Sequence, residues 1–295
     1  MRFGGHETFP VRDGWLYKGL DLLRNTPERY SDRFVSDALG VGRNMAKSIW
    51  HWLRVTGLTE SASRSHSNSP ELTAAGHCVF EHDPYMMEIG TWWALHINLV
   101  TQNTDALAWP WFFNMFGLDR FDRTHCTSQL QRYLELNNLR QVSSKTLNKD
   151  ILCLLNSYAK PVPKERGDPE DIHESPFRDL GLLTHFRDTG MYEVRREIKE
   201  IPPELMGYVL AKTFGEDQQP FLTVPFRDAM TLPGAPGRVF ALNAENLLEV
   251  LETSRAQLGD QTLTLDSLAG ERMIRVCNHP PEWWLAQYYQ GVTQA

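Results

Sequence analysis

The chain has 295 residues, of which 41% are hydrophobic and 23% charged, and its formal net charge is -7. This composition permits two or three domains with hydrophobic cores and excludes both a disordered chain and a uniformly basic protein that coats DNA. The sequence shows no signal-peptide region and no apolar window long enough to cross a bilayer, so the protein is expected to be cytoplasmic and without membrane contact. Its four cysteines include no C-x-x-C pair, so neither a zinc knuckle nor a disulfide framework is expected.

Residues 34–57, FVSDALGVGRNMAKSIWHWLRVTG, have the pattern of a helix, a tight turn at Gly40 and a second helix. In the second helix, Met45, Ile49 and Leu53 recur at i, i+4 and i+8, which predicts a buried stripe. Six residues able to donate hydrogen bonds are then expected to face outward: Arg43, Asn44, Lys47, Ser48, His51 and Arg54. This pattern predicts a helix-turn-helix that contacts bases and phosphates in the major groove of double-stranded DNA.

Two short strands flanking a polar stretch are predicted at residues 58–73, as a wing with Arg64 near its tip. Between Gly40 and His66, four Lys or Arg residues oppose one acidic residue, so this segment is net positive within an acidic chain. Local charge decides whether phosphate is attracted. The alternative is a helix-turn-helix that serves as a dimer interface or an internal scaffold.

A helical pair rich in aromatic residues is predicted over residues 85–116, after the first module ends near Asp83 and Pro84. Its Trp and Phe residues stand among apolar neighbours without interleaved Arg or Lys. Aromatic platforms that stack on bases are usually accompanied by cations, so this pattern indicates core packing.

A second candidate DNA contact is predicted in a helix that begins after Ser143 or Ser144. Its buried face comprises Leu147, Ile151, Leu154 and Tyr158, which leaves Lys145 and Lys149 outward. Six basic residues oppose two acidic ones between residues 140 and 166. A phosphate contact is therefore predicted, with a solvated helix face as the alternative.

A hairpin turn at residues 188–190 and later helices, one of them running from a cap at Asn243 to about Gln257, complete the expected organisation. We expect an α+β, mainly α protein. Its expected parts are an N-terminal winged helix-turn-helix domain (1–83), an aromatic-rich helical region (84–138), a second winged-helix-like domain (139–200) and a mostly helical C-terminal domain (201–295).

The opening sequence FGGHETFPVRDGWL contains a second set of functional candidates, His6 and Glu7, beside the glycine pair Gly4 and Gly5. Backbone amides of such glycines can approach an anion, while His6, Glu7 and Asp13 can act as metal ligands or as an acid–base pair, although their spacing matches no known metal motif. Anchoring of the N-terminus to the first helix is the equally supported structural alternative.

Asp188, followed by Glu197 and Lys199, has the outline of the D…E-x-K signature of metal-dependent nucleases. Carboxylates would hold Mg²⁺ or Mn²⁺ and the lysine would orient water for phosphodiester hydrolysis. The alternative is a structural hairpin with charged edges. Motifs of P-loop ATPases, α/β-hydrolases, zincins and Rossmann dehydrogenases are missing from the sequence.

Four stretches resemble the bacterial domain-of-unknown-function family 4007: FGGHETFPVRDGWL, ALGVGRNMAKSIWHWL, the L-T-x-x-G pattern at residues 72–76 and FALN at residues 240–243. That family is similar to the SspB component of DNA phosphorothioation defence systems against phage. The resemblance implies a DNA-nicking subunit that works beside an ATPase and a sulfurtransferase of the PAPS-reductase type. It provides no catalytic motif to assign to particular residues.

Three functions are consistent with these patterns. The first is a metal-dependent nickase that cuts one strand of duplex DNA within a modification system. The second is a non-catalytic DNA-binding adaptor that positions the sulfur-inserting partner proteins. The third is a protein-interaction scaffold whose winged helix binds another subunit.

Overall fold

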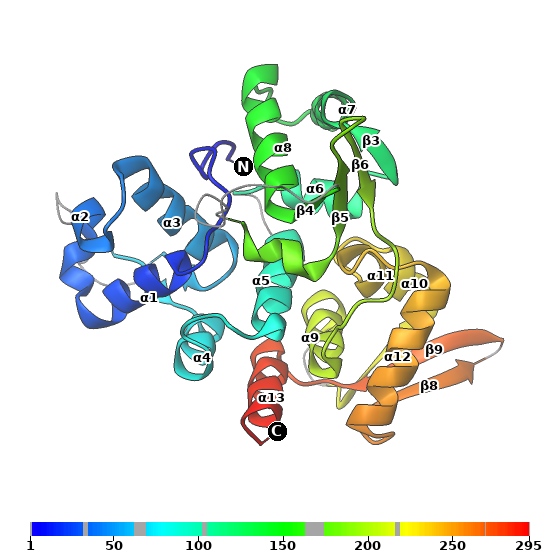
Figure 1. The fold of residues 1–295 in the computed structure, drawn as a ribbon. Helices are drawn as coiled ribbons and strands as arrows, with labels where there is room; N and C mark the ends of the chain where they lie inside the picture. Colours follow the sequence, from blue (N-terminus) through cyan, green and yellow to red (C-terminus); the bar gives the residue numbers. More distant parts are fainter. Residues whose placement is uncertain are drawn as a thin grey trace.

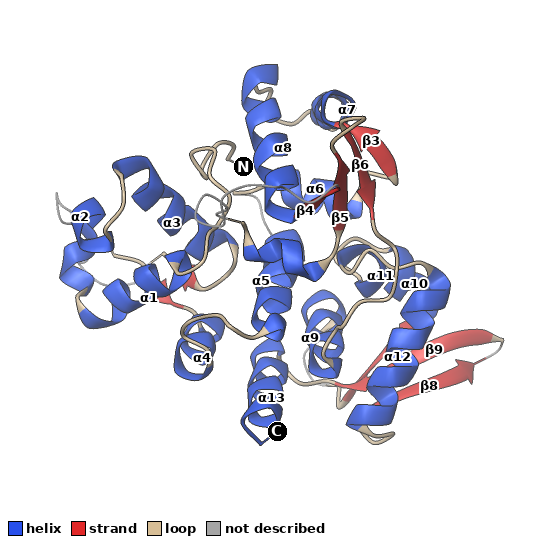
Figure 2. Ribbon diagram, in the orientation of Figure 1, coloured by secondary structure: helices blue, strands red, loops and turns tan. Residues whose placement is uncertain are grey.

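The computed structural model describes residues 2–31, 35–61, 69–101, 105–162, 174–215, 219–268 and 270–294. The chain folds into helices and three small sheets (Figures 1 and 2). The α-helices are α1 (Trp15–Asn25), α2 (Val35–Leu39), α3 (Arg43–Val55), α4 (Ala74–His82), α5 (Ile89–Thr101), α6 (Ala108–Asn114), α7 (Arg123–Leu136), α8 (Ser144–Tyr158), α9 (Pro203–Phe214), α10 (Phe226–Thr231), α11 (Pro236–Val239), α12 (Ala244–Leu258) and α13 (Pro281–Gln294). The 3-10 helices are η1 (Pro27–Ser31) and η2 (Pro176–Leu180). The strands are β1 (Thr59–Glu60), β2 (Glu71–Leu72), β3 (Arg120–Asp122), β4 (Ala159–Val162), β5 (Leu183–Phe186), β6 (Met191–Val194), β7 (Phe221–Pro225), β8 (Leu263–Leu268) and β9 (Glu271–Cys277).

The N-terminal helices and strand pair form where the sequence predicts them. α2 and α3 are joined at Gly40, whose φ of 65° is a conformation that glycine adopts without steric cost. β1 and β2 pair antiparallel, with Thr59 opposite Leu72. Arg64 lies outside the described residues.

The long aromatic-rich helix α5 runs through the centre of the molecule (Figure 1). Its residues from Gly90 to Val100 are all buried, as expected of a helix that is apolar on every side. The neighbouring aromatic side chains of α6 are buried as well, Trp109 at 1% exposure and Phe112 at 2%. Their predicted role in core packing is confirmed.

The region after α6 differs from the expected second winged helix. The predicted hairpin forms as β5 and β6, but these strands belong to a four-stranded sheet of order β3-β6-β5-β4, in which β4 and β5 run parallel. β3 comes from before residue 138 and pairs with β6 from after it. Because this sheet joins residues on both sides of the expected boundary at 138, residues 139–200 do not form a separate sheet of their own.

The C-terminal region contains a three-stranded antiparallel sheet, β7-β9-β8, in addition to its helices. Helices remain the larger part of this region, and the sheet is an addition that the sequence patterns do not predict. β7 escapes prediction because it directly precedes α10 and no hairpin turn marks it, whereas β8 and β9 were missed although Gly270, whose φ is 82°, directly precedes β9. α12 begins at the predicted cap, where the Asn243 side chain accepts a hydrogen bond from the Asn246 N–H.

None of the helices within the described residues combines the length and apolar character needed to cross a lipid bilayer.

Candidate nucleic-acid interface

The first turns of α3 expose a polar, cationic surface. Arg43, Asn44 and Lys47 are exposed, and Arg43 forms no ion pair within the described residues. The Lys47 ammonium lies 3.8 Å from the Glu7 carboxylate. Because the N-terminal end of a helix also carries partial positive charge from its free N–H groups, this end of α3 can attract phosphate.

Ser48 and His51 do not face outward, contrary to the prediction. Ser48 is fully buried and His51 is 5% exposed. Together with Trp52 and Val55 they form a second buried stripe at i, i+3, i+4 and i+7, which packs on the N-terminal segment. The Trp52 indole N–H donates to the Phe9 carbonyl at 3.0 Å. This stripe was missed because polar residues occupy half of it.

Arg54 is half-buried at the end of α3, and its guanidinium lies 3.4 Å from the Asp105 carboxylate. It is therefore less available to DNA than Arg43 and Lys47.

The N-terminal segment links α3 to α8. The Gly4 N–H donates to the Asp150 carboxylate of α8 at 3.0 Å, and the His6 Nε2 lies 3.0 Å from the same carboxylate. His6 and Asp150 are each 1% exposed. In Figure 1 the N-terminus accordingly lies between α3 and α8. The two helices predicted to contact DNA are thus connected through this segment.

Glu7 and Thr8, within the same segment, adopt left-handed backbone conformations with φ of 49° and 73°. Such conformations cost about 1–3 kcal/mol each for residues other than glycine, and they persist where the surrounding structure imposes them. Here the Thr8 N–H donates to the His6 Nδ1 at 3.0 Å, which fixes the turn. The turn presents the partly exposed Glu7 side chain beside Lys47.

His51 packs directly against this segment. A Cβ atom added at Gly5 would lie 2.4 Å from the His51 Nδ1, so only glycine fits at this position without movement. Burial, followed by electrostatic interactions with His6, Arg54 and Arg2, lowers the pKa of His51 to about 3. Its imidazole is therefore neutral at physiological pH, and it packs in the interior and does not bind phosphate.

α8 has the predicted cap and buried face. The Ser143 side chain accepts from the Thr146 N–H, and Leu147 and Ile151 are fully buried. Lys145 and Lys149 are exposed, as predicted. They supply positive charge on the helix to which the N-terminal segment is attached.

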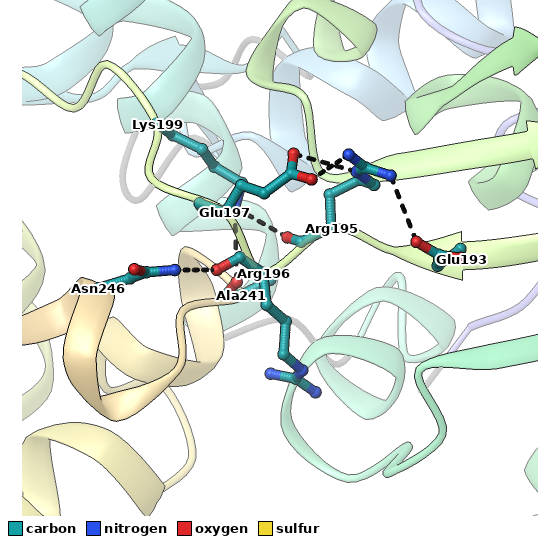
Figure 3. Close-up of polar contacts among 7 residues, drawn as sticks. All are labelled: Glu193, Arg195, Arg196, Glu197, Lys199, Ala241 and Asn246. Atoms are coloured by element: carbon teal, nitrogen blue, oxygen red, sulfur yellow. Dashed lines mark hydrogen bonds and ion pairs between the residues drawn. The ribbon is translucent and has the colours of Figure 1, made fainter.

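The residues of the nuclease-like signature do not form a common site. Asp188 lies in the turn between β5 and β6, whereas Glu197 and Lys199 follow the far end of β6. Glu197 forms an ion pair with Arg195, and this contact lowers the pKa of Glu197 (Figure 3). The Lys199 ammonium donates to backbone carbonyls of Arg195 and Glu197, each at 2.8 Å. Burial lowers the pKa of Lys199 to about 8.

These contacts do not suit a magnesium centre. Glu197 is bound to a guanidinium and separated from Asp188 by a strand, so the two carboxylates cannot share one ion. Within the described ranges, no group of three or more His, Cys, Asp or Glu side chains is arranged to hold a metal ion.

Two kinds of comparison with known proteins match all or nearly all of the chain. A model of the family described as "Protein of unknown function (DUF4007)" matches residues 3–289. Two solved structures, described as the magnesium ion-bound SspB crystal structure and the SspB crystal structure, each align with a TM-score of 0.85 and 26% sequence identity. Each alignment covers 100% of this chain and 89% of the other chain. No curated protein matches the chain.

Proposed function

The chain belongs to the DUF4007 family, and from this premise we propose that it is a DNA-binding subunit that contacts duplex DNA through the first turns of α3. The observation that carries this proposal is the exposure of Arg43, Asn44 and Lys47 together at the start of a helix that follows a tight turn. Arginine and lysine at such positions bind phosphate or guanine, and asparagine can bind adenine through two hydrogen bonds.

The N-terminal segment and α8 extend this surface. Because Gly4 and His6 are bonded to Asp150, α8 is held at a fixed position relative to α3. Lys145 and Lys149 then offer a second phosphate contact. Two separated contacts fix the orientation of a protein on a duplex better than one.

The similarity to SspB supports a more specific role. We propose that the protein acts in a phosphorothioate modification and phage-defence system, beside an ATPase and a PAPS-reductase-like sulfurtransferase. Its part would be to bind the duplex and position these partners on it.

Nicking of one DNA strand is the second candidate function, and the similarity to a magnesium-bound SspB structure favours it. Asp188, Glu197 and Lys199 do not fit a metal centre, so no catalytic step is assigned to them. Supercoiled plasmid incubated with the protein and Mg²⁺ or Mn²⁺ separates the two functions. Open-circular product that chelator abolishes establishes a nickase, whereas chelator-insensitive binding without any cut, alone or with the partner proteins, establishes an adaptor.

DNA binding is tested by titrating labelled duplex at several salt concentrations with the Arg43→Ala, Lys47→Ala double variant. We expect weaker binding. The slope of the logarithm of the binding constant against the logarithm of the salt concentration should also become shallower by about two, since each lost phosphate contact removes about one unit from this slope. Arg255→Ala, in the exposed part of α12, is the matched control and should bind as the wild type does. Equal binding by the double variant and the wild type would exclude α3 as the contact.

A further inference from the structure

A groove of about 400 Å³ lies between residues 198–203 and α12, on the side of the molecule away from α3 (Figure 1). Its lining is mainly apolar and includes Ile89, Ile201, Pro202 and Val250. Ile198, at its edge, is 47% exposed although it is a large apolar side chain. An apolar groove with an exposed aliphatic edge is typical of a surface that receives a side chain of another molecule.

The wall of the groove is rigidly held. The Lys199 ammonium donates to the carbonyls of Arg195, Glu197 and Ala241, and the Asn246 side-chain amide donates to the Arg196 carbonyl at 2.6 Å (Figure 3). A preformed wall lowers the entropic cost of binding.

The positively charged side chains of the wall are all engaged in contacts within the protein. Arg195 is paired with Glu193 and Glu197, and Arg196 with Asp119. The Lys199 ammonium is enclosed by carbonyl oxygens. The cations nearest the groove are therefore already bound.

The rim of the groove is acidic and lacks counter-ions. Glu200 and Glu249 line it, and α12 exposes Glu245, Glu249 and Glu252 at i, i+4 and i+7. Within the part of the chain that the structure describes, no Lys, Arg or His is recorded as an ion-pair partner of these four carboxylates. Like charges at i and i+4 destabilise a helix by a few tenths of a kcal/mol, a cost that a bound cation would relieve.

We propose that this groove binds a segment of a partner protein that carries an aliphatic side chain flanked by Lys or Arg. The aliphatic side chain enters the apolar groove beside Ile198, and the cations pair with Glu249 and its neighbours on α12. The acidic rim repels nucleic acid, so this surface is separate from the DNA contact proposed on α3.

The experiment uses the full chain and two labelled synthetic peptides. One forms a helix with leucine on one face and lysine on the other, and its counterpart has glutamate in place of every lysine. Fluorescence anisotropy should show binding of the lysine peptide and none of the glutamate peptide. Ile198→Asp and Glu249→Lys should each weaken binding about tenfold or more, which corresponds to about 1.4 kcal/mol.

Glu135→Lys, in the exposed part of α7, changes the net charge as Glu249→Lys does and serves as the control. We expect it to bind the lysine peptide as the wild type does. All three variants should keep wild-type binding of duplex DNA, which verifies that they fold. The proposal is overturned if neither peptide binds, if the glutamate peptide binds equally well, or if the control weakens binding as much as Glu249→Lys.

Discussion

The His6 imidazole and the Asp150 carboxylate meet in the interior, with 3.0 Å between Nε2 and Oδ1, although 144 residues separate them in sequence. Because the Thr8 N–H donates to Nδ1, the ring carries its proton on Nε2 and donates it to Asp150. The Gly4 N–H donates to the same carboxylate. One buried carboxylate therefore fixes both the ring and the backbone of the N-terminal segment.

Replacement of Asp150 by Ala should lower the free energy of unfolding by about 1–3 kcal/mol, because it leaves the buried donors of Gly4 and His6 unpaired. Urea denaturation measures this change. Asp188→Ala, at the exposed turn between β5 and β6, is the control and should change stability little. A loss below about 0.5 kcal/mol for Asp150→Ala, within the range of ordinary surface changes, would contradict the structural role of this contact.

A methyl group at Gly5 should also destabilise the protein. The added Cβ would lie 2.4 Å from Nδ1 of the buried His51 ring, which has little room to move. Overpacking of this kind costs about 1–3 kcal/mol. We expect Gly5→Ala to reduce the melting temperature and to weaken duplex binding, since the segment between α3 and α8 is displaced.

Gly117→Ala provides the comparison, because nothing lies within 4 Å of a Cβ atom at Gly117 and its backbone is not left-handed. It should melt close to the wild-type temperature. Equal melting temperatures for Gly5→Ala and Gly117→Ala would show that the contact with His51 is not tight.

The local patterns in the sequence predicted many of the helices, which are marked by their apolar residues, by a capping side chain or by both. Ser143 and Asn243 cap α8 and α12 as expected, because a side-chain oxygen before a helix satisfies a free N–H whatever the rest of the fold. The hairpin of β5 and β6 is also predicted from local sequence, because Gly190 readily adopts the left-handed backbone conformation that its turn requires.

The features that depend on distant residues were not predictable in this way. Nothing near Asp150 in the sequence indicates that His6 would reach it. The sequence predicts Ser48 and His51 on the outer face because polar residues usually face water, whereas in the structure the N-terminal segment covers them. His6 and Glu7 are functional candidates from their motif alone, whereas the contact of His6 with Asp150 of α8 and that of Glu7 with Lys47 of α3 become apparent only in the structure.

Lys199 gives a prediction that separates a structural role from a catalytic one. Its ammonium donates to the carbonyls of Arg195, Glu197 and Ala241, so Lys199→Met removes a shared donor and should destabilise the protein by about 1–3 kcal/mol. Binding of duplex DNA and any plasmid nicking should persist at temperatures where the variant is folded. Loss of nicking with an unchanged free energy of unfolding would instead assign Lys199 to catalysis.

Stability should decrease as the pH falls below about 6.5, because two imidazoles are buried in the neutral form. Burial lowers the pKa of His51 to about 3 and that of His96 to about 4, from a usual value of 6.5. Between these values and 6.5 the unfolded chain binds protons that the folded chain does not, so acid favours unfolding. Each group contributes a slope of up to about 1.4 kcal/mol per pH unit.

The two histidines should respond differently to replacement by leucine. Both ring nitrogens of His51 lack hydrogen-bond partners within the described residues, whereas His96 contacts the Tyr158 hydroxyl at 2.8 Å and the Val239 carbonyl at 2.9 Å. His51→Leu should therefore flatten the dependence of unfolding free energy on pH between 6.5 and 4 while keeping stability at pH 7.5. His96→Leu should flatten it too but lose stability at pH 7.5, because it leaves buried polar groups unpaired. Urea denaturation across this pH range measures both effects, and a His51→Leu variant whose stability declines as steeply as that of the wild type would show that His51 is not held neutral by burial.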